Sequence, residues 1–130
     1  MRILLAEDDP TSRLLASMRF RRDGHAVQEV CDGESALHAA HKCDFDLVLM
    51  DVHVPVMDGL TATRAIRTLA TDPDPTVRKR SQVPIVAVTA LAMRGDTERC
   101  LEAGMNRHLT KPLRADRLRA CLDEFARSGW

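Results

Sequence analysis

The chain is poor in aromatic residues: phenylalanine, tryptophan and tyrosine make up 3% of its 130 residues, and tyrosine is absent. Base-stacking surfaces and large aromatic ligand pockets are therefore not expected. The formal net charge of the chain is zero, because 19 Lys and Arg residues balance 19 Asp and Glu residues. This balance provides no general attraction to nucleic acid or to a membrane surface, so we expect neither as a partner.

Long apolar runs and paired cysteines are also missing. No stretch approaches the roughly 20 apolar residues of a membrane-spanning helix, and strand-like sequence follows Arg2 where a secretory signal would have its apolar region. The four cysteines show no CxxC spacing, which predicts buried free thiols rather than disulfides or zinc ligands. The expected location is the cytoplasm, and Met1 directly before the first apolar run favours a genuine amino terminus.

Short apolar runs alternate with helix-type segments along the chain. The runs that predict strands are residues 3–6, 26–30, 45–50, 83–88 and 107–109. The segments that predict helices are residues 10–22, 32–40, 59–69, 95–103 and 114–127, with Asp32 as a helix cap. This alternation predicts an α/β fold, a parallel sheet covered on both faces, in one domain spanning residues 1–130.

Polar side chains follow four of the predicted strands. Glu7 and Asp8 follow the first strand, Asp51 the third, Thr89 the fourth and Lys111 the fifth. Because the carboxyl ends of parallel strands meet at one rim of a sheet, where ligands bind, we expect these side chains to lie close together.

Carboxylates gathered at one rim need a cation. Oxygen ligands suit Mg²⁺, which keeps several waters and can exchange them for phosphate oxygens. Lys111 can reach a phosphoryl oxygen or Asp51, and Thr89 can donate a hydrogen bond to the same group. A carboxylate so placed is equipped to attack phosphorus and form an acyl phosphate. The residues therefore predict that Asp51 accepts a phosphoryl group, with Mg²⁺ as cofactor.

Four segments, in order and at suitable intervals, resemble the receiver domains of two-component response regulators: LLAEDDP, LVLMDVHVPVMDG, IVAVTA and HLTKPL. The resemblance covers essentially the whole chain, and the segment VMDGLTATRAIR is most similar to receivers of hybrid sensor histidine kinases and their phosphorelays. It implies a flavodoxin-like, doubly wound sheet of five strands in the order 2-1-3-4-5, with five helices.

The resemblance also implies a role for each residue of the first and third strand ends. Asp51 is the phosphoacceptor. Glu7 and Asp8 form the acidic metal pair, and the main-chain carbonyl of His53 completes the protein ligands of Mg²⁺. His53 stands two residues beyond the phosphoacceptor, where its side chain is expected to lean over the site and influence the lifetime of the acyl phosphate.

The fourth and fifth strands carry the implied switch. Thr89 and Lys111 contact the phosphoryl group, and Thr89 works with His108, which stands where the family usually has tyrosine or phenylalanine. Lys111-Pro112 is expected to be a cis peptide. The connection from Ala70 to Gln82 is predicted to be irregular and is longer than the family's minimal one. We interpret its basic run, Arg78-Lys79-Arg80, as an exposed loop cluster.

The implied function is signalling rather than enzymatic turnover. The phosphoryl donor is expected to be a histidine kinase or a histidine phosphotransfer protein, and the domain catalyses only its own phosphorylation and dephosphorylation. The donor is expected to dock on the first helix, where Leu14, Leu15 and Met18 supply apolar groups, some of them in the core. A downstream protein is expected on the face of the fourth helix, fifth strand and fifth helix. The chain is either a stand-alone receiver or part of a larger hybrid histidine kinase.

Other functions fit the residues less well. Phosphatases of the haloacid dehalogenase type want a DxD pattern after the first strand, where this chain has Glu7-Asp8-Asp9. A flavodoxin needs a phosphate-cradling loop there, and an acidic loop repels phosphate. A receiver that never accepts phosphate is disfavoured by the complete acidic set with Thr89 and Lys111.

Each site residue also has an ordinary structural explanation when taken alone. Asp9 before Pro10 can simply cap the first helix, and Asp58-Gly59 is typical of a turn and helix start. His38 and His41 share a helix face, which indicates a solvated surface rather than a metal site.

Overall fold

The structure, a computed structural model, describes residues 1–53, 56–89, 95–111 and 115–128. Its strands form one parallel sheet in the order β2-β1-β3-β4-β5, which confirms the predicted fold class. The strands are β1 (Arg2–Ala6), β2 (Ala26–Val30), β3 (Leu47–Asp51), β4 (Ile85–Thr89) and β5 (Arg107–Thr110). Every residue of β3 and β4 is buried, as expected for central strands covered on both faces.

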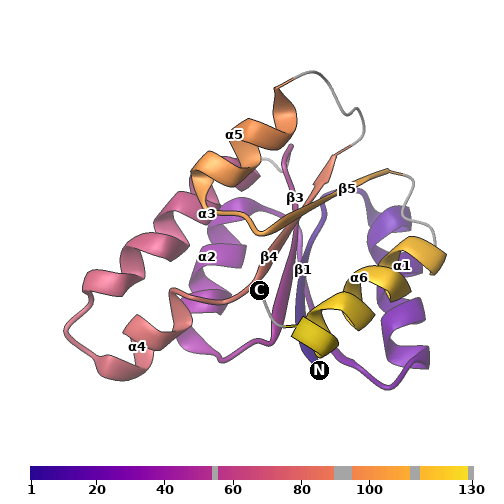
Figure 1. The fold of residues 1–130 in the computed structure, drawn as a ribbon, viewed down its shortest axis with the longest axis horizontal. Helices are drawn as coiled ribbons and strands as arrows, with labels where there is room; N and C mark the ends of the chain where they lie inside the picture. The colour runs from indigo at the N-terminus through magenta and orange to yellow at the C-terminus, as the bar shows by residue number, and fades with distance from the viewer. Residues whose placement is uncertain (54–55, 90–94, 112–114, 129–130) are drawn as a thin grey trace.

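Helices cover both faces of this sheet (Figure 1). The helices are α1 (Pro10–Arg22), α2 (Gly33–Lys42), α3 (Gly59–Thr68), α4 (Pro75–Arg80), α5 (Asp96–Ala103) and α6 (Ala115–Ser128). Side chains of β1 alternate between two cores: Ile3 and Leu5 pack with α1 and α6, whereas Leu4 and Ala6 pack with α2, α3 and α5. None of the described helices combines the length and apolarity needed to cross a membrane.

The helices that begin at the carboxyl ends of β1, β2 and β3 share one local signal. Asp9, Asp32 and Asp58 each accept a hydrogen bond from the backbone N–H three residues later and so cap α1, α2 and α3. The expected capping role of Asp9, Asp32 and Asp58 is confirmed. Each cap fixes where the chain leaves the rim of the sheet, and hence where the rim side chains lie.

The connection from residue 70 to 82 was predicted to be irregular, and this prediction was wrong. It contains a 3₁₀ turn, Leu69–Thr71, and the short helix α4, which Asp74 caps. The basic run lies in α4 rather than in a loop, although Arg78 and Lys79 are exposed as predicted. Arg78 donates to the carbonyls of Asp72 and Pro73, and Arg80 donates to Asp44 Oδ1 at 2.8 Å, with 17% of its side chain exposed. Contacts across the chain therefore hold α4 in place.

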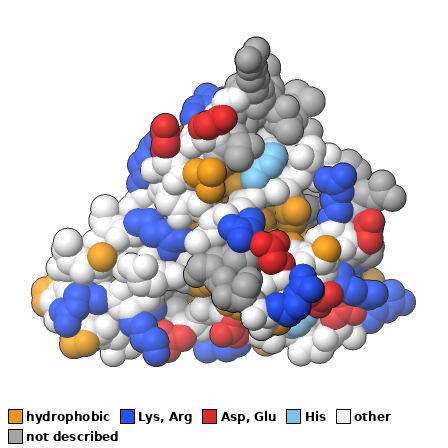
Figure 2. Space-filling view, viewed as in Figure 1, with side chains coloured by type: hydrophobic (Ala, Val, Ile, Leu, Met, Phe, Trp, Pro, Cys, Tyr) orange, Lys and Arg blue, Asp and Glu red, His pale blue; other side chains and the backbone are white. Residues whose placement is uncertain are grey.

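The surface and the cysteines agree with the composition in most respects. Acidic and basic side chains are interspersed over the face seen in Figure 2, as the zero net charge suggests. All four cysteines are free thiols, as predicted. Cys100 and Cys121 are buried, but Cys31 is exposed, so the prediction of burial was wrong for that residue.

Candidate functional site

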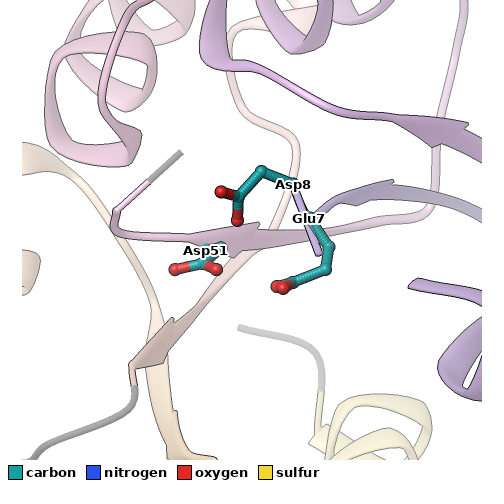
Figure 3. A group of neighbouring side chains, drawn as sticks. All are labelled: Glu7, Asp8 and Asp51. Carbon is teal, nitrogen blue, oxygen red and sulfur yellow. The ribbon is translucent and has the colours of Figure 1, made fainter. Parts of the chain in front are cut away.

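Three carboxylates converge where β1 and β3 end (Figure 3). Asp51 is the last residue of β3 and is 3% exposed, and Glu7, directly after β1, is 5% exposed. Asp8 is exposed at the same rim. One oxygen from each carboxylate lies within 4.8 Å of the other two. The sequence prediction that these residues come together is confirmed.

Lys111 supplies the positive charge beside the buried carboxylates. Its Nζ donates to Asp51 Oδ2 at 2.6 Å and lies 2.8 Å from Glu7 Oε2. The backbone N–H of His53 donates to the other Asp51 oxygen, Oδ1, at 3.0 Å. Lys111 reaches the site because β5 pairs with β4 and its own N–H donates to the Thr89 carbonyl at 2.7 Å. Asp51 is therefore held by one ammonium and one backbone donor.

The charges of this cluster are not fully balanced. Burial, followed by a hydrogen bond with Asp51, raises the pKa of Glu7 to about 7. Burial also acts to raise the pKa of Asp51, but hydrogen bonds with Glu7, Lys111 and the His53 N–H outweigh it and lower that pKa. Hydrogen bonds to Asp51 and Glu7 likewise outweigh burial and raise the pKa of Lys111. Asp51 is thus the ionised carboxylate, whereas Glu7 titrates near neutral pH.

These residues fit a hard divalent cation. Carboxylate oxygens are the ligands that Mg²⁺ prefers, and it usually takes only one or two of them while keeping waters. Asp8 is open to solvent at the same rim as the two buried acids, so three carboxylates gather around the ammonium of Lys111. The main-chain carbonyl of His53 as a further ligand stays a prediction.

Thr89 and His108 lie on neighbouring strands beside the site. Thr89, the last residue of β4, is 2% exposed. His108 is paired with Ala87, which belongs to the core under α2, α3 and α5. The Nε2 atom of His108 is buried and has no hydrogen-bond partner among the described residues. A hollow of about 80 Å³ beside Thr89 is lined by Val52, His53, Leu60, Thr89, Arg99 and Cys100. The structure thus brings Thr89 to the site and places space next to it, and the switch role of the pair stays a prediction.

The sequence analysis did not identify two residues that support the site, Arg13 and Gly59. Arg13 Nη1 donates to the Glu7 carbonyl at 2.9 Å, and its Nε lies 3.7 Å from Glu29 Oε1. A Cβ on Gly59 would lie 2.5 Å from the Asp51 carbonyl oxygen, so only glycine lets α3 begin this close to β3. The Asp58-Gly59 pair was a visible signal for a turn, but it did not reveal this close contact.

Two further predictions have different outcomes. Pro112 lies outside the described residues, so the expected cis peptide after Lys111 is not tested by the structure. The expectation that part of Leu14, Leu15 and Met18 belongs to the core was wrong, because their exposed fractions are 54%, 61% and 57%. All three side chains face solvent on α1.

Comparison with known proteins agrees with this geometry. The family model of the response regulator receiver domain matches residues 3–123. The chain belongs to the response regulator receiver family. It is therefore a receiver domain of the kind found in two-component and phosphorelay signalling.

The curated relatives of this receiver are much longer proteins. It is 41% identical over 112 residues to the sensor protein GacS of Pseudomonas syringae, covering 86% of this chain and 12% of that protein. It is 37% identical over 123 residues to the sensor protein EvgS of Escherichia coli K12, covering 95% of this chain and 9% of that protein. The receiver thus corresponds to a small part of sensor kinases of this kind.

Solved receiver structures resemble it over nearly their whole length. The receiver domain of the sensor histidine kinase PA1611 of Pseudomonas aeruginosa, which has a magnesium ion in its active-site cleft, is 40% identical with a TM-score of 0.81 and coverage of 95% and 94%. A chain in the co-crystal of the Saccharomyces cerevisiae phosphotransfer protein Ypd1 with the Ssk1 receiver is 26% identical with a TM-score of 0.85 and coverage of 95% and 87%.

Proposed function

We propose that this receiver takes a phosphoryl group onto Asp51 from a phosphohistidine of a histidine kinase or a histidine phosphotransfer protein. The main support is the state of Asp51, which is a buried, ionised carboxylate held by Lys111 and by the His53 N–H. A buried carboxylate that stays ionised at the rim of a sheet is available to act as a nucleophile. The Ypd1–Ssk1 co-crystal supports the class of donor.

Transfer exchanges one bond for another. An oxygen of Asp51 forms the new bond to phosphorus while the bond between phosphorus and the donor imidazole nitrogen breaks. The bonding electron pair returns to that nitrogen, which leaves as neutral imidazole when the other ring nitrogen carries a proton. Lys111 can donate a hydrogen bond to the phosphoryl oxygens, because its Nζ already contacts Oδ2 of Asp51, the residue to which the phosphoryl group is added.

Glu7, Asp8 and Asp51 are the residues that would hold Mg²⁺, as the magnesium-bound PA1611 receiver suggests. When bound, the ion supplies Lewis-acid neutralisation of the negative charge on the phosphoryl oxygens. The chain's own task is to keep Asp51 oriented, which it does through the His53 N–H and Lys111.

Partner contacts divide between two faces of the receiver. The donor histidine must reach Asp51, so the donor protein covers the nearby face of α1, where Leu14, Leu15 and Met18 are exposed. A cavity of about 440 Å³ adjoins this face and is lined by Leu15 and by the site residues Glu7 and Lys111. The signal leaves through α5, β5 and α6, the elements beside Thr89 and His108.

Intact-mass measurement tests the chemistry directly. The wild-type chain, incubated with acetyl phosphate and Mg²⁺, is expected to gain one phosphoryl group that is labile in base and stable in acid. Asp51→Asn is expected to gain none, whereas Asp123→Asn, a surface change on α6, is the matched control and is expected to react like wild type. Persistence of the adduct in Asp51→Asn would refute the assignment.

A further inference from the structure

The backbone of Glu7 is held by hydrogen bonds at both its N–H and its carbonyl. The N–H donates to the Val30 carbonyl of β2 at 3.1 Å, and the carbonyl accepts from Arg13 Nη1 at 2.9 Å. Because the Glu7 carbonyl and the Asp8 N–H belong to one planar peptide group, the direction of this carbonyl fixes how the chain turns from one acid to the next. Figure 3 shows both side chains pointing from this turn toward Asp51. The orientation of a single peptide group therefore sets where two of the three carboxylates lie.

Arg13 is in turn held by Glu29 of β2. Arg13 Nε lies 3.7 Å from Glu29 Oε1, and Arg21 Nη2 lies 3.4 Å from the other oxygen, Oε2. Arg21 Nη2 also donates to the Val27 carbonyl at 3.1 Å, which ties it to the same strand. The side chains of Arg13 and Glu29 are only 25% and 29% exposed. Glu29 thus lies between two guanidinium groups of α1 and directs that of Arg13 toward the Glu7 carbonyl.

The place of Arg13 along α1 is unfavourable for the helix itself. The Arg13 N–H donates to the carbonyl of Asp9, the residue that caps α1, so Arg13 lies one turn from the amino end. The helix dipole favours anions at this end and opposes cations, and the first turn of α1 has no acidic residue to offset the charge. The contacts with Glu7 and Glu29, rather than any stabilisation of the helix, therefore explain an arginine at this position.

We propose that Arg13 is a positioning residue for the acidic pair: it holds the Glu7–Asp8 peptide in the orientation in which both carboxylates can bind Mg²⁺, and Glu29 holds Arg13. This role rests on the magnesium binding proposed above. Arg13 acts through the Glu7 carbonyl, a neutral acceptor of a strong hydrogen bond from a charged donor. Strand β2, which supplies no ligand in the proposed metal site, thereby contributes to that site.

The affinity for Mg²⁺, measured by calorimetric titration, separates positioning from plain charge. Arg13→Met is expected to weaken binding about tenfold, the usual cost of losing a group that orients a metal ligand. Removing a nearby positive charge would by itself tighten the binding of a cation, so the two roles predict changes of opposite sign. Arg22→Met removes the same charge from an exposed site on α1 and is the matched control, expected not to weaken binding. Unchanged or tighter binding in Arg13→Met would overturn the proposal.

Glu29→Gln tests whether Arg13 is held from β2. This change is expected to weaken Mg²⁺ binding about threefold, because glutamine cannot form the ion pair. In the double variant the loss is expected to equal that of Arg13→Met alone, because Glu29 acts only through Arg13. Independent charge effects would instead oppose each other, since one change removes a positive and the other a negative charge. A double variant that binds like wild type, or losses that multiply, would contradict the link between Glu29 and Arg13.

NMR of the metal-free chain tests the hydrogen bond directly. In Arg13→Met, the carbonyl carbon of Glu7 and the amide of Asp8 are expected to shift because the carbonyl loses its donor, whereas both keep their wild-type shifts in Arg22→Met. Arg13→Lys keeps the charge but not the planar fork, and serves if the methionine variant does not fold; it is expected to shift the same two nuclei. Wild-type shifts at Glu7 and Asp8 in the Arg13 variants would refute the positioning. A wild-type chain that binds no Mg²⁺ contradicts the proposed function instead, and the positioning is then judged from these shifts alone.

Discussion

The proton on Glu7 gives the metal-free receiver an unusual dependence of stability on pH. Folding raises the pKa of this carboxyl from 4.5 to about 7, chiefly through burial and then through the hydrogen bond with Asp51. The folded state therefore binds more protons than the unfolded state between these values, so the free energy of unfolding falls as pH rises through that window. At about 1.4 kcal/mol for each pKa unit, Glu7 costs the folded chain about 3 kcal/mol at pH 8 relative to pH 4.

The comparison of wild type with Glu7→Gln isolates this effect, because glutamine keeps a donor for Asp51 but never ionises. Other groups cancel in the difference: the lowered pKa of His25, caused by burial and the amino terminus, acts in the opposite direction, and the lowered pKa values of Asp9, Asp32 and Asp44 act below about pH 4. Urea unfolding in EDTA, followed by circular dichroism from pH 5 to 8, is expected to show Glu7→Gln gaining up to about 3 kcal/mol on wild type as pH rises. Saturating Mg²⁺ is expected to shrink the difference, because the ion binds only the ionised carboxylate. Parallel pH profiles of the two chains in EDTA would refute the reasoning.

Three further predictions concern the metal, the backbone and the donor. Asp8→Asn is expected to weaken Mg²⁺ binding at least about tenfold in calorimetric titration, because it removes one full ligand charge; an unchanged affinity would place the ion elsewhere. Gly59→Ala is expected to destabilise the chain by about 1–3 kcal/mol and to slow phosphorylation by acetyl phosphate, because its Cβ would press on the Asp51 carbonyl; full activity and stability would show that the β3–α3 junction yields freely. Leu15→Ser is expected to slow transfer from a phosphohistidine protein about fivefold to thirtyfold while leaving transfer from acetyl phosphate unchanged, because only the protein donor covers α1; equal rates with both donors would contradict that docking face.

The sheet and the site could be predicted because their signals are local in sequence. The apolar runs of β3 and β4 each end on a residue of the site, Asp51 or Thr89, and the common direction of parallel strands then brings those ends together. The helix caps could be predicted for the same reason, since Asp32 accepts a hydrogen bond from an N–H only three residues later.

The features that were missed depend on partners far away in the sequence. Helix α4 is held by Arg80, whose partner Asp44 is 36 residues earlier, and no periodicity within residues 70–82 reports that contact. Arg67 likewise donates hydrogen bonds to the Gly104 carbonyl and to Asn106 Oδ1, which lie 37 and 39 residues later in the chain. The exposure of Leu15 was missed because apolar residues occur on more than one side of α1, so their spacing does not reveal which side faces the core.

The strand order has a consequence for how the receiver is made. Glu7, Asp8 and Asp51 all belong to the first 51 residues, whereas the ammonium that contacts the two buried acids follows β5, about 60 residues after Asp51. Domains generally fold as units, so the three carboxylates and Lys111 come together only in the complete sheet. The phosphoacceptor site therefore needs all of the chain from β1 to Lys111, and a chain cut before β5 has the acids but not the ammonium that holds Asp51.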